Sequence, residues 1–145
     1  VPHLHLEVRA GVNAFGATQN PLLWIAPWGG SGVIAGRLVD PDGRAWQGVT
    51  VTLIDRNGEA DFLNTWTYLD DPDHLIRPDP SLAENFVFGP VAAGAYDVYA
   101  KIQGVEYRQP VEVRDGEISA VEIVTEPYRT PTPEASPTPE ASPTP

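Results

Sequence analysis

The sequence contains no cysteine and no methionine among its 145 residues. Without cysteine the chain can form no disulfide, no cysteine-ligated zinc site and no thiol nucleophile. Basic side chains are also few: 9 Lys and Arg stand against 20 Asp and Glu, which gives a net charge of −11. Nucleic-acid binders carry a basic stripe, and polybasic membrane anchors carry clustered Lys and Arg. The charge pattern therefore sets aside both classes of partner.

Long apolar runs are missing as well. No stretch approaches the ~20 residues that a membrane-spanning helix needs, so no membrane span is predicted. The chain also shows no signal peptide. It begins at Val1 inside an alternating, strand-like segment. Together with the missing methionine, this favours a processed form or, as we expect, a fragment of a longer protein.

Glycine and proline are in excess, at 13 and 16 residues, compared with an average combined share of about 12%. Short apolar runs separated by turn signals occupy residues 33–126. In one of these runs Tyr96, Val98, Ala100 and Ile102 fall on the same face, because side chains alternate in direction along a strand. This spacing predicts a mainly β fold, an antiparallel β-sandwich.

Two segments depart from that pattern. Residues 61–85 are polar and interrupted by proline, which predicts a long loop with one strand around 65–69. Residues 131–142 repeat Pro-Thr-Pro-Glu-Ala-Ser without a single large aliphatic side chain. Such a sequence cannot bury a core, so we predict a disordered, solvated tail over 127–145 with a bias to polyproline II.

The residues that point most directly to chemistry are His3 and His5. In a strand, positions i and i+2 face the same way, so their Cβ atoms lie ~6–7 Å apart. Two such imidazoles can both ligate a metal, or one can ligate while the other reaches the metal-bound water or a substrate oxygen. Taken alone, the pattern also suits two half-exposed histidines on a surface strand, and both interpretations stay open.

Residues 2–9 read Pro-His-Leu-His-Leu-Glu-Val-Arg, and residues 20–25 read Asn-Pro-Leu-Leu-Trp-Ile. In order and spacing, the two motifs resemble the C-terminal end of the lysostaphin-type (LytM-like) zinc metallopeptidases, which cut peptide cross-links in bacterial cell walls. The resemblance implies that His5 is a zinc ligand. It also implies that His3 is the catalytic histidine, which acts on the metal-bound water or on the oxyanion.

The same resemblance implies that part of the site lies elsewhere. The other two ligands of this family, a His and an Asp in a His-x-x-x-Asp motif, would precede Val1. His74 lacks the flanking residues of the family and is interpreted as a loop residue. Because a catalytic zinc site needs about three protein ligands, we expect zinc in the intact protein. We expect neither tight zinc binding nor peptidase activity in this chain alone.

A second resemblance covers roughly residues 32–126. Residues 36–43, 48–53 and 86–99 read Gly-Arg-Leu-Val-Asp-Pro-Asp-Gly, Gly-Val-Thr-Val-Thr-Leu and Phe-Val-Phe-Gly-Pro-Val-Ala-Ala-Gly-Ala-Tyr-Asp-Val-Tyr. Together they resemble a carboxypeptidase regulatory-like (transthyretin-like) domain. The resemblance implies a transthyretin- or immunoglobulin-like sandwich that serves as an accessory module, since members of this family usually do no chemistry.

Two further groups of side chains suggest ligand binding. Asp70, Asp71, Asp73 and Asp79 could gather Ca²⁺, but a solvated acidic loop is favoured because no Asp-x-Asp-x-Asp-Gly loop is present. Several aromatic residues could form a sugar-stacking platform, but burial or packing at joints is favoured. These aromatic residues are Trp24, Trp28, Trp46, Trp66, Tyr68 and Tyr99.

The sequence thus predicts four segments. They are a C-terminal remnant of a β-rich peptidase domain (1–27), a linker (28–31), a carboxypeptidase regulatory-like β-sandwich (32–126) and a disordered Pro-rich tail (127–145). The leading hypothesis is the C-terminal part of a secreted bacterial cell-wall zinc endopeptidase, which in its intact form acts on peptidoglycan cross-link peptides. The alternative is a non-catalytic binding, adhesion or spacer module of an extracellular protein, with a glycan or a protein as its partner.

Overall fold

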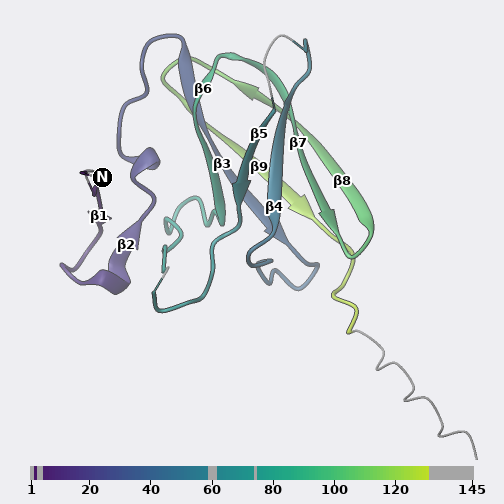
Figure 1. Ribbon diagram of the computed structural model, residues 1–145, viewed down its shortest axis with the longest axis horizontal. Helices are drawn as coiled ribbons and strands as arrows, with labels where there is room; N and C mark the ends of the chain where they lie inside the picture. Colours follow the sequence, from purple (N-terminus) through teal and green to yellow (C-terminus); the bar gives the residue numbers. More distant parts are fainter. Residues whose placement is uncertain (1, 3–4, 59–61, 74, 131–145) are drawn as a thin grey trace, which may run out of the picture.

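The computed structural model describes residues 2, 5–58, 62–73 and 75–130 (Figure 1). Within these residues, seven strands form two sheets that pack face to face, in the orders β6–β3–β9 and β5–β4–β7–β8. The mainly β sandwich predicted from the sequence is confirmed. The strands are β3 (Ser31–Val39), β4 (Thr50–Asp55), β5 (Leu63–Trp66), β6 (Phe86–Ala92), β7 (Gly94–Ile102), β8 (Val105–Val113) and β9 (Ile118–Val124).

The strands of the sandwich pair antiparallel except β3 and β9. These two run parallel, from Val33 opposite Ile118 to Val39 opposite Val124. After β8 the chain crosses from the four-stranded sheet to the three-stranded sheet, and β9 therefore runs beside β3 in the same direction. The sequence predicted an antiparallel sandwich, and the parallel pair of β3 and β9 is the one departure from it among these strands. Tight turns have local signatures, whereas a crossover between sheets has none.

The core lies between the two sheets and follows the alternation of the strands. Tyr96, Val98, Ala100 and Ile102 of β7 are buried, which confirms the face predicted for this run. Exposed positions such as Lys101 point the other way. The other members of the buried cluster are Ile34, Leu38, Val51, Leu53, Phe86, Phe88, Val91, Val113, Val121 and Ile123.

A close contact between the neighbouring strands β3 and β6 involves Gly36. Gly36 on β3 lies opposite Phe86 on β6, and the Phe86 ring fills the space that a side chain at position 36 would need. A Cβ atom there would lie 1.9 Å from Phe86 Cζ. Phe86 is fully buried and meets Phe88 edge to face, with ring centroids 5.9 Å apart. Glycine normally weakens a strand, but here the ring requires it.

The linker predicted at residues 28–31 ends where β3 begins, at Ser31. The Gly30 N–H donates to Asp115 Oδ1 at 2.7 Å, which ties the linker to the turn before β9. Gly32 is buried within β3, and a Cβ on it would lie 2.4 Å from a carbonyl oxygen of that same turn. The glycines here serve close packing and hydrogen bonding.

The described part of the N-terminal segment lies beside the sandwich and outside both of its sheets (Figure 1). β1 pairs antiparallel with β2, and Arg77 of the long loop attaches the segment to the sandwich. Its backbone N–H donates to Thr18 O at 2.7 Å, and its Nε donates to Gly16 O at 3.0 Å. The segment consists of β1 (Val8–Arg9), the 3₁₀ turn η1 (Phe15–Ala17), β2 (Thr18–Gln19) and the 3₁₀ turn η2 (Pro21–Leu23).

The long loop contains one short strand, as predicted, but β5 begins at Leu63, two residues before the predicted position. Two single backbone hydrogen bonds hold the chain just beyond β5. The Thr67 N–H donates to Val49 O, before β4, at 2.9 Å, and the Tyr68 N–H donates to Asn85 O, before β6, at 2.7 Å. None of the helices in the described part of the chain has the length and apolar character that crossing a membrane requires.

The chain that follows β9 stays on the sandwich as far as it is described. The Gln103 side chain forms two hydrogen bonds with the backbone of Arg129. It accepts from the Arg129 N–H at 2.9 Å and donates to the Arg129 carbonyl at 2.8 Å. The Glu126 N–H donates to the Tyr107 hydroxyl at 2.9 Å. The first residues of the predicted tail therefore have a defined path. The repeats, in residues 131–145, lie outside the described residues.

Candidate ligand-binding site

The structure places one of the two predicted site histidines. His5 lies in an exposed segment before β1, whereas His3 and His74 lie outside the described residues. Among the residues that the structure describes, no group of three or more His, Cys, Asp or Glu could hold a metal ion. These residues do not supply a complete zinc site, and the roles of His3 and His5 stay predictions.

The carboxylates of the acidic loop serve local turns. The Asp79 carboxylate accepts from the Ser81 N–H at 2.8 Å and from the Leu82 N–H at 3.2 Å. Hydrogen bonds from the Ser81 hydroxyl and backbone hold the pKa of Asp79 below its usual value. Asp71 accepts from the Asp73 N–H at 2.8 Å. Asp side chains commonly close turns in this way, and the arrangement suits the solvated loop that the sequence favoured.

The aromatic residues considered for a sugar platform are spread over the molecule. Trp24 donates its indole N–H to Gln19 Oε1 at 3.0 Å within the N-terminal segment, and Trp28 is 68% exposed in the linker. Trp46, Trp66 and Tyr68, however, gather at the end of the sandwich where β9 finishes, the lower end in Figure 1. We call this the aromatic end, defined by Trp46, Trp66, Tyr68 and Tyr128.

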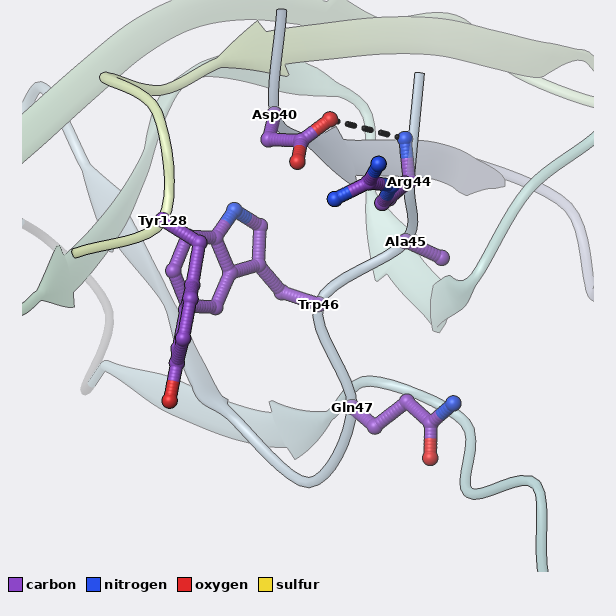
Figure 2. Close-up of a pocket in the computed structure, with 6 residues that line it drawn as sticks. All are labelled: Asp40, Arg44, Ala45, Trp46, Gln47 and Tyr128. Carbon is purple, nitrogen blue, oxygen red and sulfur yellow. Dashed lines mark hydrogen bonds between the residues drawn. The ribbon is translucent and has the colours of Figure 1, made fainter. Parts of the chain in front are cut away.

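The first hollow of the aromatic end surrounds Trp46 and has a volume of ≈ 320 Å³ (Figure 2). The Tyr128 ring lies 5.7 Å from the Trp46 ring, centroid to centroid, at an angle of 48°. The indole N–H of Trp46 donates to Thr125 Oγ1 at 2.9 Å, and the ring packs against the core. One side of this ring is therefore fixed by the fold. The remaining lining residues are Asp40, Arg44, Ala45 and Gln47.

Asp40 and Arg44 form the polar edge of the first hollow. Asp40 Oδ1 accepts from the N–H groups of Asp42 and Arg44, both at 2.9 Å. In Figure 2 the other oxygen of Asp40 is turned toward Trp46, and the Arg44 guanidinium extends into the same space. The Arg44 side chain is 78% exposed and pairs with Asp42 only at 3.9 Å. An acceptor and a donor thus lie beside one aromatic ring.

A second hollow of ≈ 520 Å³ lies next to the first. Gln47 lines the first hollow and Gly48 lines the second, so the two adjoin along the chain. Trp66, at the end of β5, is 64% exposed, and Leu69 is 41% exposed. The second hollow is the more apolar in composition. Its lining residues are Gly48, Trp66, Thr67, Tyr68, Leu69 and Ile76.

The Asn85 side chain holds the backbone at Trp46 in place by hydrogen bonds. Its side chain accepts from the Leu38 N–H at 2.8 Å and donates to Leu38 O at 2.9 Å and to Trp46 O at 3.2 Å. Asn85 is buried, with 4% of its surface exposed. Buried backbone groups need such partners. The position of the Trp46 ring is therefore set by the end of β3 and by the residue before β6.

A buried carboxyl lies behind the second hollow. Glu84 is fully buried, and it accepts from the Tyr68 hydroxyl at 3.2 Å and from the Asp79 N–H at 2.9 Å. Burial raises the pKa of Glu84 above its usual value. Burial and the Glu84 charge raise the pKa of Tyr68 far above its own.

The raised pKa of Glu84 predicts a pH-dependent stability. Ionisation of Glu84 is harder in the folded chain than in the unfolded chain, so its contribution is present at low pH and is lost as the pH rises through the folded pKa. Glutamine at position 84 stays neutral at every pH. We therefore expect the free energy of unfolding of Glu84→Gln to exceed that of the natural chain by a margin that grows as the pH rises from about 4 to neutrality.

Denaturant titrations across this pH range measure the difference in free energy of unfolding between the two chains. The glutamine amide can accept from Asp79 N–H and donate to the Tyr68 oxygen, so the network is kept. Glu112→Gln, on an exposed position of β8, is the matched control and should leave the pH profile unchanged. Parallel curves for Glu84→Gln and the natural chain would contradict the prediction.

Sequence reasoning missed five of the six residues that line the first hollow, all except Trp46. Asp40 begins the run Asp-Pro-Asp-Gly, whose residue types are those of a turn, and Arg44 follows that run. Tyr128 lies four residues after β9, in the segment predicted as tail. A lone tyrosine at the edge of a repetitive, aromatic-free tail was the available signal that this position belongs to the folded part.

No protein-family model matches the chain, and no curated protein matches it. Among solved structures the chain is similar to a candidate carbohydrate-binding protein from Pseudomonas aeruginosa, at 17% identity and a TM-score of 0.38, over 71% of this chain and 94% of that one. It is also similar to BcpA, the major pilin subunit of Bacillus cereus, at 13% identity and a TM-score of 0.36. That match covers 66% of this chain and 29% of the pilin subunit. Neither similarity is strong enough to assign a function.

Proposed function

We propose that the sandwich together with the chain just beyond β9, residues 31–130, forms a non-catalytic binding module of a secreted protein of the bacterial cell envelope, and that the aromatic end is its binding face. The observation that carries this proposal is the exposure of large aromatic rings around two adjoining hollows at one end of a β-sandwich. The proposal corresponds to the binding-module alternative drawn from the sequence. Bacterial peptidoglycan is the partner that we propose for it.

The exposed rings of the aromatic end support a binding role. Trp66 is 64% exposed and Tyr128 is 55% exposed. Apolar surface gathered in one exposed place is typical of an interaction site. Tyr and Trp suit such sites because they supply a large contact area at a low cost in conformational entropy.

A sedimentation experiment tests this proposal. The full chain is expected to sediment with purified, insoluble peptidoglycan, and the double variant Trp66→Ala/Tyr128→Ala is expected to bind at least about tenfold more weakly, because aromatic anchors dominate binding energy. Trp28→Ala is the matched control, since Trp28 is equally exposed, at 68%, in the linker. Thermal unfolding of each variant confirms that the fold is retained.

Two results would contradict the proposal. One is the absence of sedimentation by the natural chain. The other is an equal loss of binding in Trp28→Ala and in the double variant, because the aromatic end would then have no special role. The turbidity of the same suspensions reports hydrolysis of the wall, and this measurement bears on the second candidate function.

The second candidate is the C-terminal part of a cell-wall zinc endopeptidase. It is favoured by the motifs at residues 2–9 and 20–25. Under this proposal His5 would ligate zinc and His3 would act on the substrate in the intact protein. Clearing of the wall suspension by this chain with added zinc, lost in His5→Ala, would show that the chain itself carries the activity.

A further inference from the structure

We infer that the first hollow of the aromatic end binds a neutral oligosaccharide, with one pyranose ring packed against the Trp46 and Tyr128 rings and its hydroxyl groups bonded to Asp40 and Arg44. This inference rests on the proposed function and names the ligand of the same face. It is carried by three observations: a fixed aromatic ring, a donor and acceptor pair beside it, and a second aromatic hollow adjoining the first.

Trp46 is held in place before any ligand binds. Its indole N–H donates to Thr125 Oγ1, its backbone carbonyl accepts from the buried Asn85 side chain, and its ring packs on the core. A pre-positioned ring loses little conformational freedom on binding, so more of the contact energy is retained as affinity. The carbon–hydrogen face of a pyranose is flat and apolar, and an aromatic ring of this kind can cover it.

The polar edge supplies what a pair of neighbouring hydroxyl groups needs. A hydroxyl can donate and accept, a carboxylate only accepts, and a guanidinium only donates. One hydroxyl can therefore donate to the Asp40 oxygen that is turned toward Trp46, while its neighbour accepts from Arg44 (Figure 2). Bonds to charged groups are stronger than neutral ones. Asp40 keeps its position because Oδ1 is already bonded to two backbone N–H groups.

The charge of the site selects a neutral ligand. Asp40 and Asp42 flank the single guanidinium of Arg44, and the chain as a whole carries −11. An anionic sugar polymer would meet repulsion both at long range and at the hollow itself. A neutral sugar meets none, and its hydroxyl groups use both signs of charge at the polar edge.

The second hollow indicates a chain of sugars rather than a single one. It adjoins the first across Gln47 and Gly48, and it offers Trp66, 64% exposed, as another aromatic face. An oligosaccharide that crosses this boundary can contact both rings within one binding event. The second contact then acts at a high effective concentration. Affinity should therefore rise steeply between a monosaccharide and a tetrasaccharide.

Calorimetry on the full chain tests the inference, with tetrameric N-acetylglucosamine and cellotetraose as neutral probes. We expect one of them to bind with a Kd of about 1 mM or tighter, and the matching monosaccharide to bind at least tenfold more weakly. Arg44→Met is expected to weaken binding about tenfold, the scale of one charge-assisted hydrogen bond. Arg114→Met, an exposed arginine in the turn before β9, is the matched control. In amide and indole NMR spectra the Trp46 indole signal should shift and the Trp28 signal should not.

Two further probes separate other ligand classes. Tetragalacturonate is the anionic sugar, and the peptide Pro-Thr-Pro-Glu-Ala-Ser-Pro-Thr-Pro-Glu-Ala-Ser is the proline-rich chain that aromatic grooves also accept. Preferential binding of either one would overturn the inference. So would neutral binding that is unaffected by Arg44→Met, because the site would then lie elsewhere. If peptidoglycan sediments the chain but no neutral sugar binds, the ligand class is wrong and the binding module stands. If neither binds, both proposals fail.

Discussion

Gly36→Ala is expected to abolish cooperative folding of the sandwich, or to lower its free energy of unfolding by more than about 3 kcal/mol. An added Cβ would lie 1.9 Å from Phe86 Cζ and 2.2 Å from Phe86 Cε2, closer than nonbonded atoms approach. Phe86 cannot swing away, because it is fully buried and packs against Phe88. β3 cannot shift either, because it is paired on both sides.

Thermal and urea unfolding monitored by circular dichroism measure this loss. Gly29→Ala is the matched control, because no described heavy atom beyond its chain neighbours lies within 4 Å of a Cβ at that position. The double variant Gly36→Ala/Phe86→Leu should recover part of the stability, since a smaller side chain opposite position 36 relieves the overlap. A Gly36→Ala chain that unfolds at the natural temperature would contradict the close contact between β3 and β6.

Asn85→Ala is expected to cost about 3 kcal/mol of stability, although asparagine is usually a surface residue. The substitution leaves the buried Leu38 N–H and the Trp46 carbonyl without their side-chain partner. Each buried polar group left unpaired costs about 1–3 kcal/mol. Because the same bonds position Trp46, ligand binding at the aromatic end should weaken as well. Denaturant unfolding and the sedimentation assay measure the two effects separately.

Asn85→Asp extends this prediction. A carboxylate would face two carbonyl oxygens in a buried site, so this variant should be the least stable of the series at neutral pH. It should recover as the pH falls, since protonation removes the charge and restores one donor. Asn57→Ala, in an exposed turn after β4, is the control and should change stability by less than about 0.5 kcal/mol. A neutral result for Asn85→Ala would mean that water replaces the amide.

The sandwich could be predicted from the sequence because its signals are local. The alternation from Tyr96 to Ile102 predicted the buried face of β7. The parallel pairing of β3 with β9 could not be predicted, because it joins segments 85 residues apart, Val33 with Ile118, through a crossover between sheets. The same holds for Asn85, whose polar side chain looks like a loop residue until its partners at the end of β3 are known.

The candidate site was predicted only in part. The sequence supplied the aromatic residues, but it could not divide them, so Trp24 and Trp28 entered the same set as Trp46 and Trp66. It also treated Tyr128 as part of a tail, although its ring lies 5.7 Å from that of Trp46. A site built from a turn after β3, the end of β5 and the chain beyond β9 exists only once those segments meet. Composition identifies its members, and topology brings them together.

The parallel pair of β3 and β9 has a mechanical consequence. The chain enters the sandwich at the start of β3 and leaves it at the end of β9, and these two points lie at opposite ends of the pair. A pull between them acts along the strands, so the seven paired positions from Val33 to Val39 bear the force together. A hairpin pulled at its open ends would instead separate one pair after another. The bonds between Gln103 and Arg129 attach the exit segment to the turn between β7 and β8, so a pull on that segment must break these bonds before the load reaches β9.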